Sequence, residues 1–284
     1  RVQRPDQVVR RTEHAREVES LSEFVRPVAP DVAVDGVWLI SGGAGGVGRL
    51  IAEDLAFRAR RHGSIVRLIL LGRRNSSPDI EEFTGRLTGG GVVCTYESVD
   101  ITDAAAVRAL VVRVSAEHGA VTDVIHAAGV VHDGLHAAKS EETIQKVLAP
   151  KVLGTLALHD AVADQPLRSF MLCSSLAASI ANPGQADYAA ANGFEDSFAL
   201  WRAAAVRRGE ARGHSVSVGW PLWAHAGMGL APAAAARMTA QTGLVPLPTE
   251  TALDLFHALR LQSPARVLPL IGDPTRIRSF VARA

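Results

Sequence analysis

The stretch that decides the fold is Val37-Trp38-Leu39-Ile40-Ser41-Gly42-Gly43-Ala44-Gly45-Gly46-Val47-Gly48-Arg49-Leu50-Ile51-Ala52. Its first apolar run is typical of a buried parallel strand, and the glycines open a segment whose apolar residues recur at helical spacing. Glycines let the backbone turn tightly, and the first N–H groups of a helix attract a pyrophosphate. A glycine turn can also be a plain turn. With a strand before it and a helix after it, we expect a nucleotide site bound by Ser41, Gly42, Gly43, Gly45, Gly46, Val47 and Gly48.

Length and composition fit an ordinary globular chain. Its 284 residues are 48% hydrophobic and carry a formal net charge of +1, which argues against a nucleic-acid partner. No apolar run approaches the ~20 residues needed to span a bilayer, and no signal peptide is present. We therefore expect a cytoplasmic protein with no membrane partner. Cys94 and Cys173 are expected to be buried reduced thiols, and the histidines show no metal-ligand spacing.

From residue 36 onward, strand patterns and helix patterns alternate. Further strands are predicted at 65–71, 92–99, 123–126, 170–174, 215–220 and 266–270, and helices at 103–119, 141–163, 186–208 and 249–261. This alternation predicts an α/β fold, a doubly wound parallel sheet of Rossmann-like type with helices on both faces. Asp103 is expected to cap its helix. Pro150 predicts a kink or a break in the helix that contains it, and Pro269 places the last strand at a sheet edge.

Three regions are expected along the chain. Residues 1–35 are charged, contain three prolines and are predicted to be a linker or lead-in segment with at most a short helix or strand. Residues 36–284 form the main domain. Within it, the glycine- and alanine-rich segment 224–243 is predicted to be a mobile lid, with a packed pair of helices as the alternative.

The end of the second strand of such a sheet meets the adenosine ribose, where a carboxylate favours NAD and a cation favours the 2′-phosphate of NADP. Here the strand ends Leu71-Gly72-Arg73-Arg74-Asn75 with no carboxylate. Arg73, supported by Arg74, therefore predicts NADPH, although arginines on a loop can also be merely solvated. We expect the rest of the cofactor to contact Asp100, Ile101, Ala127, Ala128, Gly129 and Pro221, with capping of the helix that begins near Asp103 as the alternative for Asp100.

A serine pair and a tyrosine are the candidates for chemistry. Ser174-Ser175 ends a strand, and Tyr188 opens a helix thirteen positions after Ser175. Strand ends at one edge of a parallel sheet face the same crevice, so both hydroxyls can reach one carbonyl. A phenol with an ordinary pKa near ~10 needs a nearby ammonium to act at neutral pH. This serine and tyrosine resemble those of short-chain dehydrogenases, in which the lysine follows the tyrosine by four residues. Here that position is Asn192, and a lysine occurs instead at position 151, on the preceding helix.

This exchange of lysine and asparagine between helices makes residues 36–272 resemble the ketoreductase domain of modular polyketide synthases, a branch of the short-chain dehydrogenase/reductase superfamily. Matching motifs are the glycine turn, Arg73, His126-Ala127-Ala128-Gly129, Lys151, Ser174-Ser175, Tyr188-Ala189-Ala190-Ala191-Asn192, Trp220-Pro221-Leu222-Trp223 and Gly227-Met228. The resemblance implies that NADPH reduces a 3-ketoacyl thioester held by phosphopantetheine on an acyl carrier protein.

The resemblance also implies roles for individual residues. Tyr188 would protonate the new alkoxide, Ser175 would bond its oxygen, Lys151 would tune Tyr188 and hold the ribose, and Asn192 would position water or Lys151. Ser174 is expected to be structural. In the family, a Leu-Asp-Asp stretch and a tryptophan eight residues before the tyrosine mark opposite alcohol configurations. This chain has Val131-His132-Asp133 and Ile180 at these positions, which favours the D-alcohol, unless Asp133 is only a turn residue beside Gly134.

Two other functions stay open. The chain could be a free-standing short-chain reductase of a small ketone, which the exchange of Lys151 and Asn192 argues against. It could also be a non-catalytic scaffold, which the complete set of catalytic residues disfavours. Related ketoreductases carry an N-terminal structural subdomain, for which 35 residues are too few. We therefore expect neighbouring synthase domains, or a structural subdomain supplied elsewhere, as partners.

Overall fold

Seven parallel strands form the central sheet of the computed structural model, which describes residues 9–11, 16–18, 22–24, 33–180, 182–224 and 232–281. The strand order is β5-β4-β3-β6-β7-β8-β9. The strands are β3 (Gly36–Ser41), β4 (Val66–Gly72), β5 (Val92–Ser98), β6 (Val121–His126), β7 (Ser169–Ser175), β8 (His214–Trp220) and β9 (Arg266–Val267). This architecture confirms the predicted doubly wound sheet.

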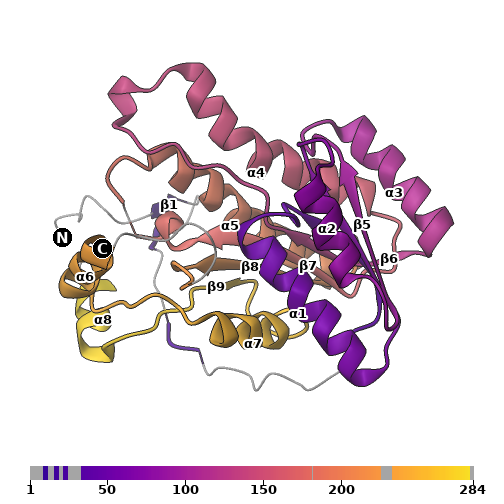
Figure 1. The fold of residues 1–284 in the computed structure, drawn as a ribbon. Coiled ribbons are helices and arrows are strands. Elements are labelled where there is room, and N and C mark those ends of the chain that lie inside the picture. Colours follow the sequence, from indigo (N-terminus) through magenta and orange to yellow (C-terminus); the bar gives the residue numbers. More distant parts are fainter. Residues whose placement is uncertain are drawn as a thin grey trace.

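Helices connect these strands and cover both faces of the sheet (Figure 1). They are α1 (Gly46–His62), α2 (Pro78–Leu87), α3 (Ala104–His118), α4 (Glu141–Ala161), α5 (Ala186–Arg207), α6 (Pro232–Thr242), α7 (Thr249–Leu259) and α8 (Pro274–Val281). Short 3-10 turns, His136–Ala138 and Leu176–Ala178, follow β6 and β7. In the N-terminal segment, β1 (Val9–Arg11) pairs antiparallel with β2 (Arg16–Val18).

Each face of the sheet has its own apolar core, because residues of the central strands alternate between the two faces. On one face, Trp38 and Leu68 pack with residues of α1 and α7 such as Leu55 and Phe256. On the other face, β-strand residues pack against α3, α4 and α5. Cys94 and Cys173 are buried free thiols, as predicted.

The local signals and the observed elements differ at Pro150 in α4, at the end of β9, and at α2 and α8. Asp103 caps α3 as predicted, since its carboxylate accepts from Ala105 N and Ala106 N. Helix α4 continues past Pro150, so a break there is wrong. The edge strand β9 ends at Val267, because only its first two residues pair with β8. Helices α2 and α8 were not predicted. Of the segment 224–243, the structure describes 224 and 232–243; Gly227, Met228 and Gly229 lie outside the described residues.

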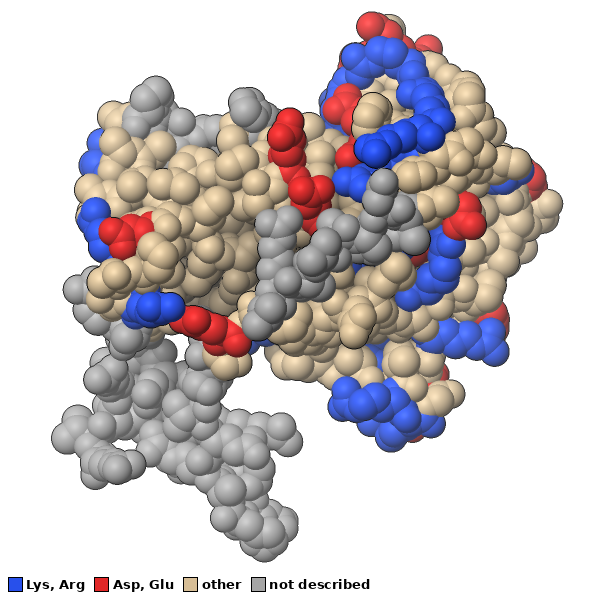
Figure 2. Space-filling model, turned by 90° about the horizontal axis from the view of Figure 1, so that it is seen from below, with Lys and Arg blue, Asp and Glu red and all other residues tan. Residues whose placement is uncertain are grey.

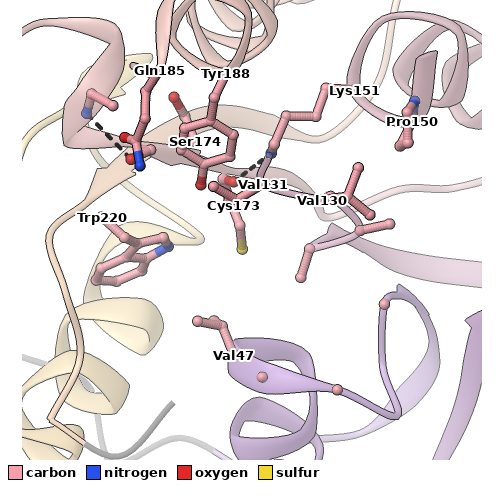
Figure 3. A pocket seen from close by; sticks show the side chains of 18 of the residues that line it. Val47, Val130, Val131, Pro150, Lys151, Cys173, Ser174, Gln185, Tyr188 and Trp220 are labelled. Atoms are coloured by element: carbon pink, nitrogen blue, oxygen red, sulfur yellow. Dashed lines mark hydrogen bonds between the residues drawn. The ribbon is translucent and has the colours of Figure 1, made fainter. Parts of the chain in front are cut away.

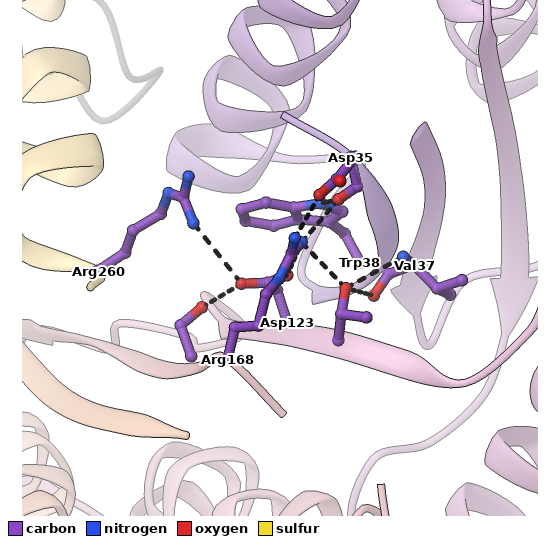
Figure 4. Close-up of polar contacts among 8 residues, drawn as sticks. Asp35, Val37, Trp38, Asp123, Arg168 and Arg260 are labelled. Carbon is purple, nitrogen blue, oxygen red and sulfur yellow. Dashed lines mark hydrogen bonds and ion pairs between the residues drawn. The ribbon is translucent and has the colours of Figure 1, made fainter. Parts of the chain in front are cut away.

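Beside the amino ends of the strands, charged groups join segments far apart in the chain (Figure 4). The buried carboxylate of Asp123 accepts from Ser169 Oγ at 2.6 Å and from Arg168 Nε at 2.9 Å, and lies 3.8 Å from Arg260. Arg168 also pairs with Asp35, just before β3. This cluster therefore ties β6, the start of β7, the segment after α7 and the entry to β3 together.

Charge is unevenly distributed on the face seen in Figure 2, which α1 and α7 cover. Lys and Arg side chains gather toward one end of the molecule in this view. Much of the remaining described surface in this view is uncharged. Among the described helices, none combines the length and apolarity needed to cross a bilayer.

Candidate active site

The glycine turn between β3 and α1 lies where the strand order reverses, between β3 and β6. Gly42 has a φ of +70°, and a Cβ there would lie 2.8 Å from Ala128 N. A Cβ on Gly48 would lie 2.5 Å from the Gly42 carbonyl oxygen. Helix α1 has no acidic residue in its first turn and no side-chain cap, so its positive end is not neutralised locally. The turn therefore offers backbone N–H groups to an anion.

A cleft of about 1560 Å³ lies along the carboxyl ends of the strands. Most of the predicted site residues line it: Gly42, Gly45, Gly46, Val47, Arg73, Arg74, Asp100, Ile101, Ala127, Ala128, Gly129, Asp133, Lys151, Ser175, Tyr188 and Pro221. Four predicted residues, Ser41, Gly43, Gly48 and Asn192, lie behind the lining. The volume exceeds the usual ~300–1,000 Å³ of a small-molecule pocket, so the cleft has room for a dinucleotide and a substrate.

The far end of the cleft is formed after β4 and β5. Arg73 and Arg74 are exposed, and Tyr96 Oη donates to the Arg74 carbonyl at 2.8 Å. Asp100 accepts from Thr102 N at 2.9 Å. That hydrogen bond, and more weakly the charge of Arg73, lower the pKa of Asp100. Asp100 thus shapes the turn before α3 while its side chain also faces the cleft.

These features fit a dinucleotide. The glycines allow a turn that is too tight for side chains at Gly42 and Gly48, the start of α1 favours a pyrophosphate, and guanidinium groups stand at the opposite end of the cleft. Among the described residues, no cluster of three or more His, Cys, Asp or Glu could hold a metal ion.

Lys151 and Tyr188 come from neighbouring helices and face the same cavity (Figure 3). Lys151 is 3% exposed, and its Nζ donates to the Cys173 carbonyl at 2.9 Å and to Glu195 Oε2 at 2.7 Å. Burial lowers the pKa of Lys151, but the charges of Glu195 and then of Tyr188 hold it above its usual value. The ammonium is therefore held inside the protein, at the cavity that Tyr188 also lines, and not in bulk water.

The two serines at the end of β7 differ in environment. Ser175 is half-buried, lines the cleft and accepts from Ala177 N at 3.2 Å. Ser174 is 4% exposed and donates to the Asn192 carbonyl at 3.2 Å, so its hydroxyl ties β7 to α5. This contact agrees with the structural role expected for Ser174.

Asn192 is fully buried one turn after Tyr188. Its Nδ2 donates to the Tyr188 carbonyl at 2.7 Å, while Oδ1 has no hydrogen-bond partner among the described residues. A buried unpaired amide oxygen costs about 1–3 kcal/mol unless an ammonium, hydroxyl or water reaches it. Its role in positioning water or Lys151 stays a prediction.

Two buried residues of the site escaped the sequence analysis as functional candidates. Glu195 binds Lys151, and His126 connects Ser41 of the glycine turn with the Pro150 carbonyl. A helical signal for Glu195 was present, because positions 188, 192 and 195 share one face of a helix. A lone glutamate is usually solvent-exposed, so the sequence by itself does not mark Glu195 as a buried partner.

The mouth of the cleft is held by polar contacts between the segment after β6 and the start of α5. Gln185 Nε2 donates to Asp133 Oδ1 at 2.8 Å. Lys139 Nζ donates to Asp187 Oδ1 at 2.6 Å and to the Gly184 carbonyl at 3.2 Å. Asp133 is therefore held by Gln185, three residues before Tyr188. It is the one acid of the Leu-Asp-Asp motif that this chain retains.

The sequence profile of the KR domain matches residues 36–225 of this chain. The chain belongs to the KR domain family. This KR domain is similar to polyketide synthases, with 40% identity over 253 residues to polyketide synthase ThaG of Burkholderia thailandensis and 34% over 245 residues to polyketide synthase PksN of Bacillus subtilis. These alignments cover 89% and 86% of the chain, and 4% of each relative.

The KR domain also resembles a solved ketoreductase domain from the bacillaene assembly line. The TM-score is 0.88 at 34% identity, over 96% of this chain and 64% of that one. The family places the chain in the short-chain dehydrogenase/reductase superfamily, whose fold implies a nicotinamide cofactor and an oxidoreductase activity. The chain spans about 4% of the length of each of these two polyketide synthases.

Proposed function

We propose that this KR domain uses NADPH to reduce a 3-ketoacyl thioester, carried on an acyl carrier protein, to the 3-hydroxyacyl thioester. The observation that carries the proposal is the convergence of Lys151 and Tyr188, from α4 and α5, over a cleft with a dinucleotide cradle. The polyketide synthase relatives support the carrier-bound substrate and neighbouring synthase domains as partners.

The chain's own groups have distinct tasks in this reduction. Bound NADPH supplies the hydride that adds to the 3-keto carbon. Tyr188 donates the proton to the carbonyl oxygen, and the Lys151 ammonium stabilises the phenolate that remains. The Ser175 hydroxyl donates a hydrogen bond to the oxygen as negative charge develops. The proton lost by Tyr188 is restored from water, so the ketone gains one hydride and one proton.

The direct test is NADPH oxidation, followed by absorbance, with a carrier-bound 3-ketoacyl chain and with a simple cyclic ketone. We expect the carrier-bound substrate to have a kcat/KM at least about tenfold higher, a difference of ~1.4 kcal/mol in transition-state binding. Equal rates on both substrates favour a free-standing reductase. A wild-type chain that neither oxidises NADPH nor quenches its fluorescence on titration would be a scaffold.

The preference for NADPH is proposed from Arg73 and Arg74, which line the cleft after β4 without a carboxylate beside them. We expect Arg73→Glu to lower the NADPH-to-NADH ratio of kcat/KM by at least about tenfold, because it replaces a cation by an acid at the ribose end. A ratio unchanged in both Arg73→Glu and Arg74→Glu contradicts the assignment.

We further propose a D-configured product. Supporting this, Asp133 lines the cleft and is bound by Gln185 beside Tyr188, and Ile180 occupies the position of the tryptophan that marks the other configuration. Chiral chromatography of the reduced thioester tests the configuration, and an L-alcohol contradicts it.

A further inference from the structure

A buried carboxylate lies behind the Lys151 ammonium. Glu195 is fully buried on α5, and its Oε2 accepts from Lys151 Nζ at 2.7 Å. Its other oxygen, Oε1, lies 3.5 Å from His126 Nε2 and has no hydrogen-bond partner among the described residues. None of the steps above uses this acid. A buried carboxylate persists in a core only when a cation or hydrogen bonds compensate it.

Of the two basic groups beside Glu195, only Lys151 is charged. Burial, then the charge of Lys151, lower the pKa of His126 to about 3, so its imidazole is neutral. His126 Nε2 lies 3.0 Å from the Pro150 carbonyl, which can only accept, so we assign the proton to Nε2. Nδ1 then accepts from the Ser41 hydroxyl at 2.5 Å. Burial raises the pKa of Glu195 to about 8, and the charge of Lys151 opposes this rise. Glu195 therefore becomes the counter-charge of Lys151 in the alkaline range in which Lys151 itself titrates.

The connected side chains are buried up to Lys151, which borders the cleft. Ser41, His126 and Glu195 are each 0% exposed, so the chain of contacts from the glycine turn to Lys151 stays inside the protein. Glu195 must act through its charge and its contact with the ammonium. A purely steric role would not require an acid at this position.

We infer that Glu195 is a positioning residue, which keeps Lys151 charged and directed at Tyr188 and thereby sets the pH range over which Tyr188 can donate its proton. The first half of this inference concerns the protein alone, and the second half rests on the proposed function.

The other groups around Glu195 do not replace it. The Cys173 thiol of β7 is neutral because burial raises its pKa to about 12. Asp196, next on α5, is turned to Ser217, whose Oγ donates to it at 2.6 Å, and to Arg266 at 3.0 Å. With the Glu195 charge removed, the Lys151 ammonium keeps the Cys173 carbonyl and loses its anion. Burial then disfavours the ammonium, and its pKa falls.

Glu195→Gln tests this in the protein without cofactor or substrate. The chain has three lysines, Lys139, Lys146 and Lys151, so a sample with ¹³C-labelled lysine side chains gives three signals, and Lys151→Met assigns the one of interest. We expect the Lys151 signal of the wild type to titrate above its ordinary value and that of Glu195→Gln at least about one pH unit lower. Exposed Lys146 is the internal reference.

The pH profile of the reductase provides the second readout. We expect the alkaline limb of kcat/KM to move at least about one pH unit lower in Glu195→Gln, and Glu195→Asp, which keeps the charge, to restore most of it. Asp54→Asn is the matched control. It removes a carboxylate of α1 that pairs with buried His257 at 2.5 Å and does not line the cleft. We expect no change in the titration of Lys151 or in the alkaline limb.

The inference is wrong if Lys151 titrates at the same pH in Glu195→Gln as in the wild type. It is also wrong if the alkaline limb of kcat/KM stays in place while kcat/KM falls equally at every pH. If Glu195→Gln does not fold, the wild type decides: a Lys151 that titrates below its ordinary value is incompatible with an anionic partner. Failure of the proposed function is read separately, as a wild type that does not oxidise NADPH with any 3-ketoacyl thioester.

Discussion

Tyr188 is the residue on which the proposed chemistry depends most directly. It is half-buried, lines the cleft and points into the same cavity as Lys151. The chain has one other tyrosine, Tyr96, which also lines the cleft but donates to the Arg74 carbonyl. Replacing each tyrosine by phenylalanine therefore distinguishes the loss of the proton donor from the loss of any other hydroxyl in the cleft.

We expect Tyr188→Phe to lower kcat by about 10²–10⁴-fold, because a positioned general acid contributes that much, while NADPH still quenches the protein fluorescence. Tyr96→Phe is the matched control and keeps kcat within about threefold, since within the described part of the chain its hydroxyl bonds to a backbone carbonyl. Steady-state NADPH oxidation measures both. A Tyr188→Phe variant with more than a tenth of the wild-type kcat contradicts the assignment.

At the scale of elements, a glycine lets α4, the helix that carries Lys151, approach the sheet. A Cβ on Gly154 of α4 would lie 2.7 Å from Ile101 Cδ1 and 3.6 Å from His126 Cε1. Glycine at this position therefore lets the helix that carries Lys151 pack against β6 and the start of α3. The helix continues through Pro150, whose carbonyl accepts from the His126 ring in place of a solvent contact.

Helix α3 offers a test of element stability away from the chemistry. Asp103 accepts from the first free N–H groups of α3, and we expect Asp103→Ala to lower the free energy of unfolding by about 1 kcal/mol. The neighbouring Asp100→Ala removes a turn contact without uncapping the helix and should cost less. Urea denaturation measures both, and equal losses contradict the assignment of the cap to Asp103.

At the scale of the whole molecule, Asp123 joins segments from four parts of the chain (Figure 4). We expect Asp123→Ala to lower the free energy of unfolding by about 3–5 kcal/mol, because it leaves Arg260, which is 4% exposed, without its buried anion. Glu210→Gln, in an exposed pair with Arg208, should leave the urea midpoint unchanged. A small effect of Asp123→Ala would show that water or other carboxylates replace the contact.

Stability should also fall on mild acidification. Burial lowers the pKa of His126 to about 3 and also lowers the pKa of His159, His214 and His257. The unfolded chain therefore takes up protons below about pH 6.5 that the native state refuses. The stabilisation is complete above that pH and is lost progressively as the pH falls toward 3. At pH 5, which is 1.5 units below the unfolded pKa, His126 alone lowers the free energy of unfolding by about 2 kcal/mol relative to neutral pH.

Melting curves at pH 7.5 and pH 5 for the wild type and His126→Gln test this. We expect the melting temperature of the wild type to fall between these values and that of His126→Gln to fall less, because glutamine does not titrate. If the melting temperature falls equally between pH 7.5 and pH 5 in both proteins, His126 is not a neutral buried group.

Local patterns predicted the strands of the central sheet, helices α1, α3, α4, α5 and α7, and most of the residues that line the cleft. The glycine turn, the arginines after the second strand and the tyrosine at a helix start are signals within a few residues, and a parallel sheet brings its carboxyl ends to one edge. Helix α2 carried such signals as well, with Ser77 before Pro78 and acids in the first turn. They were overlooked because the helix is short.

By itself, the sequence determined the doubly wound fold and the exchange of lysine and asparagine, since alternating periodicity and motif spacing are properties of the chain read in order. Only the tertiary structure decided which acid faces Lys151 and which groups surround Asp123. Glu195 is 44 positions from Lys151, and Arg168 is 133 from Asp35. The energy of a buried charge depends on the partner that the fold places beside it, and that partner cannot be predicted from its position in the sequence.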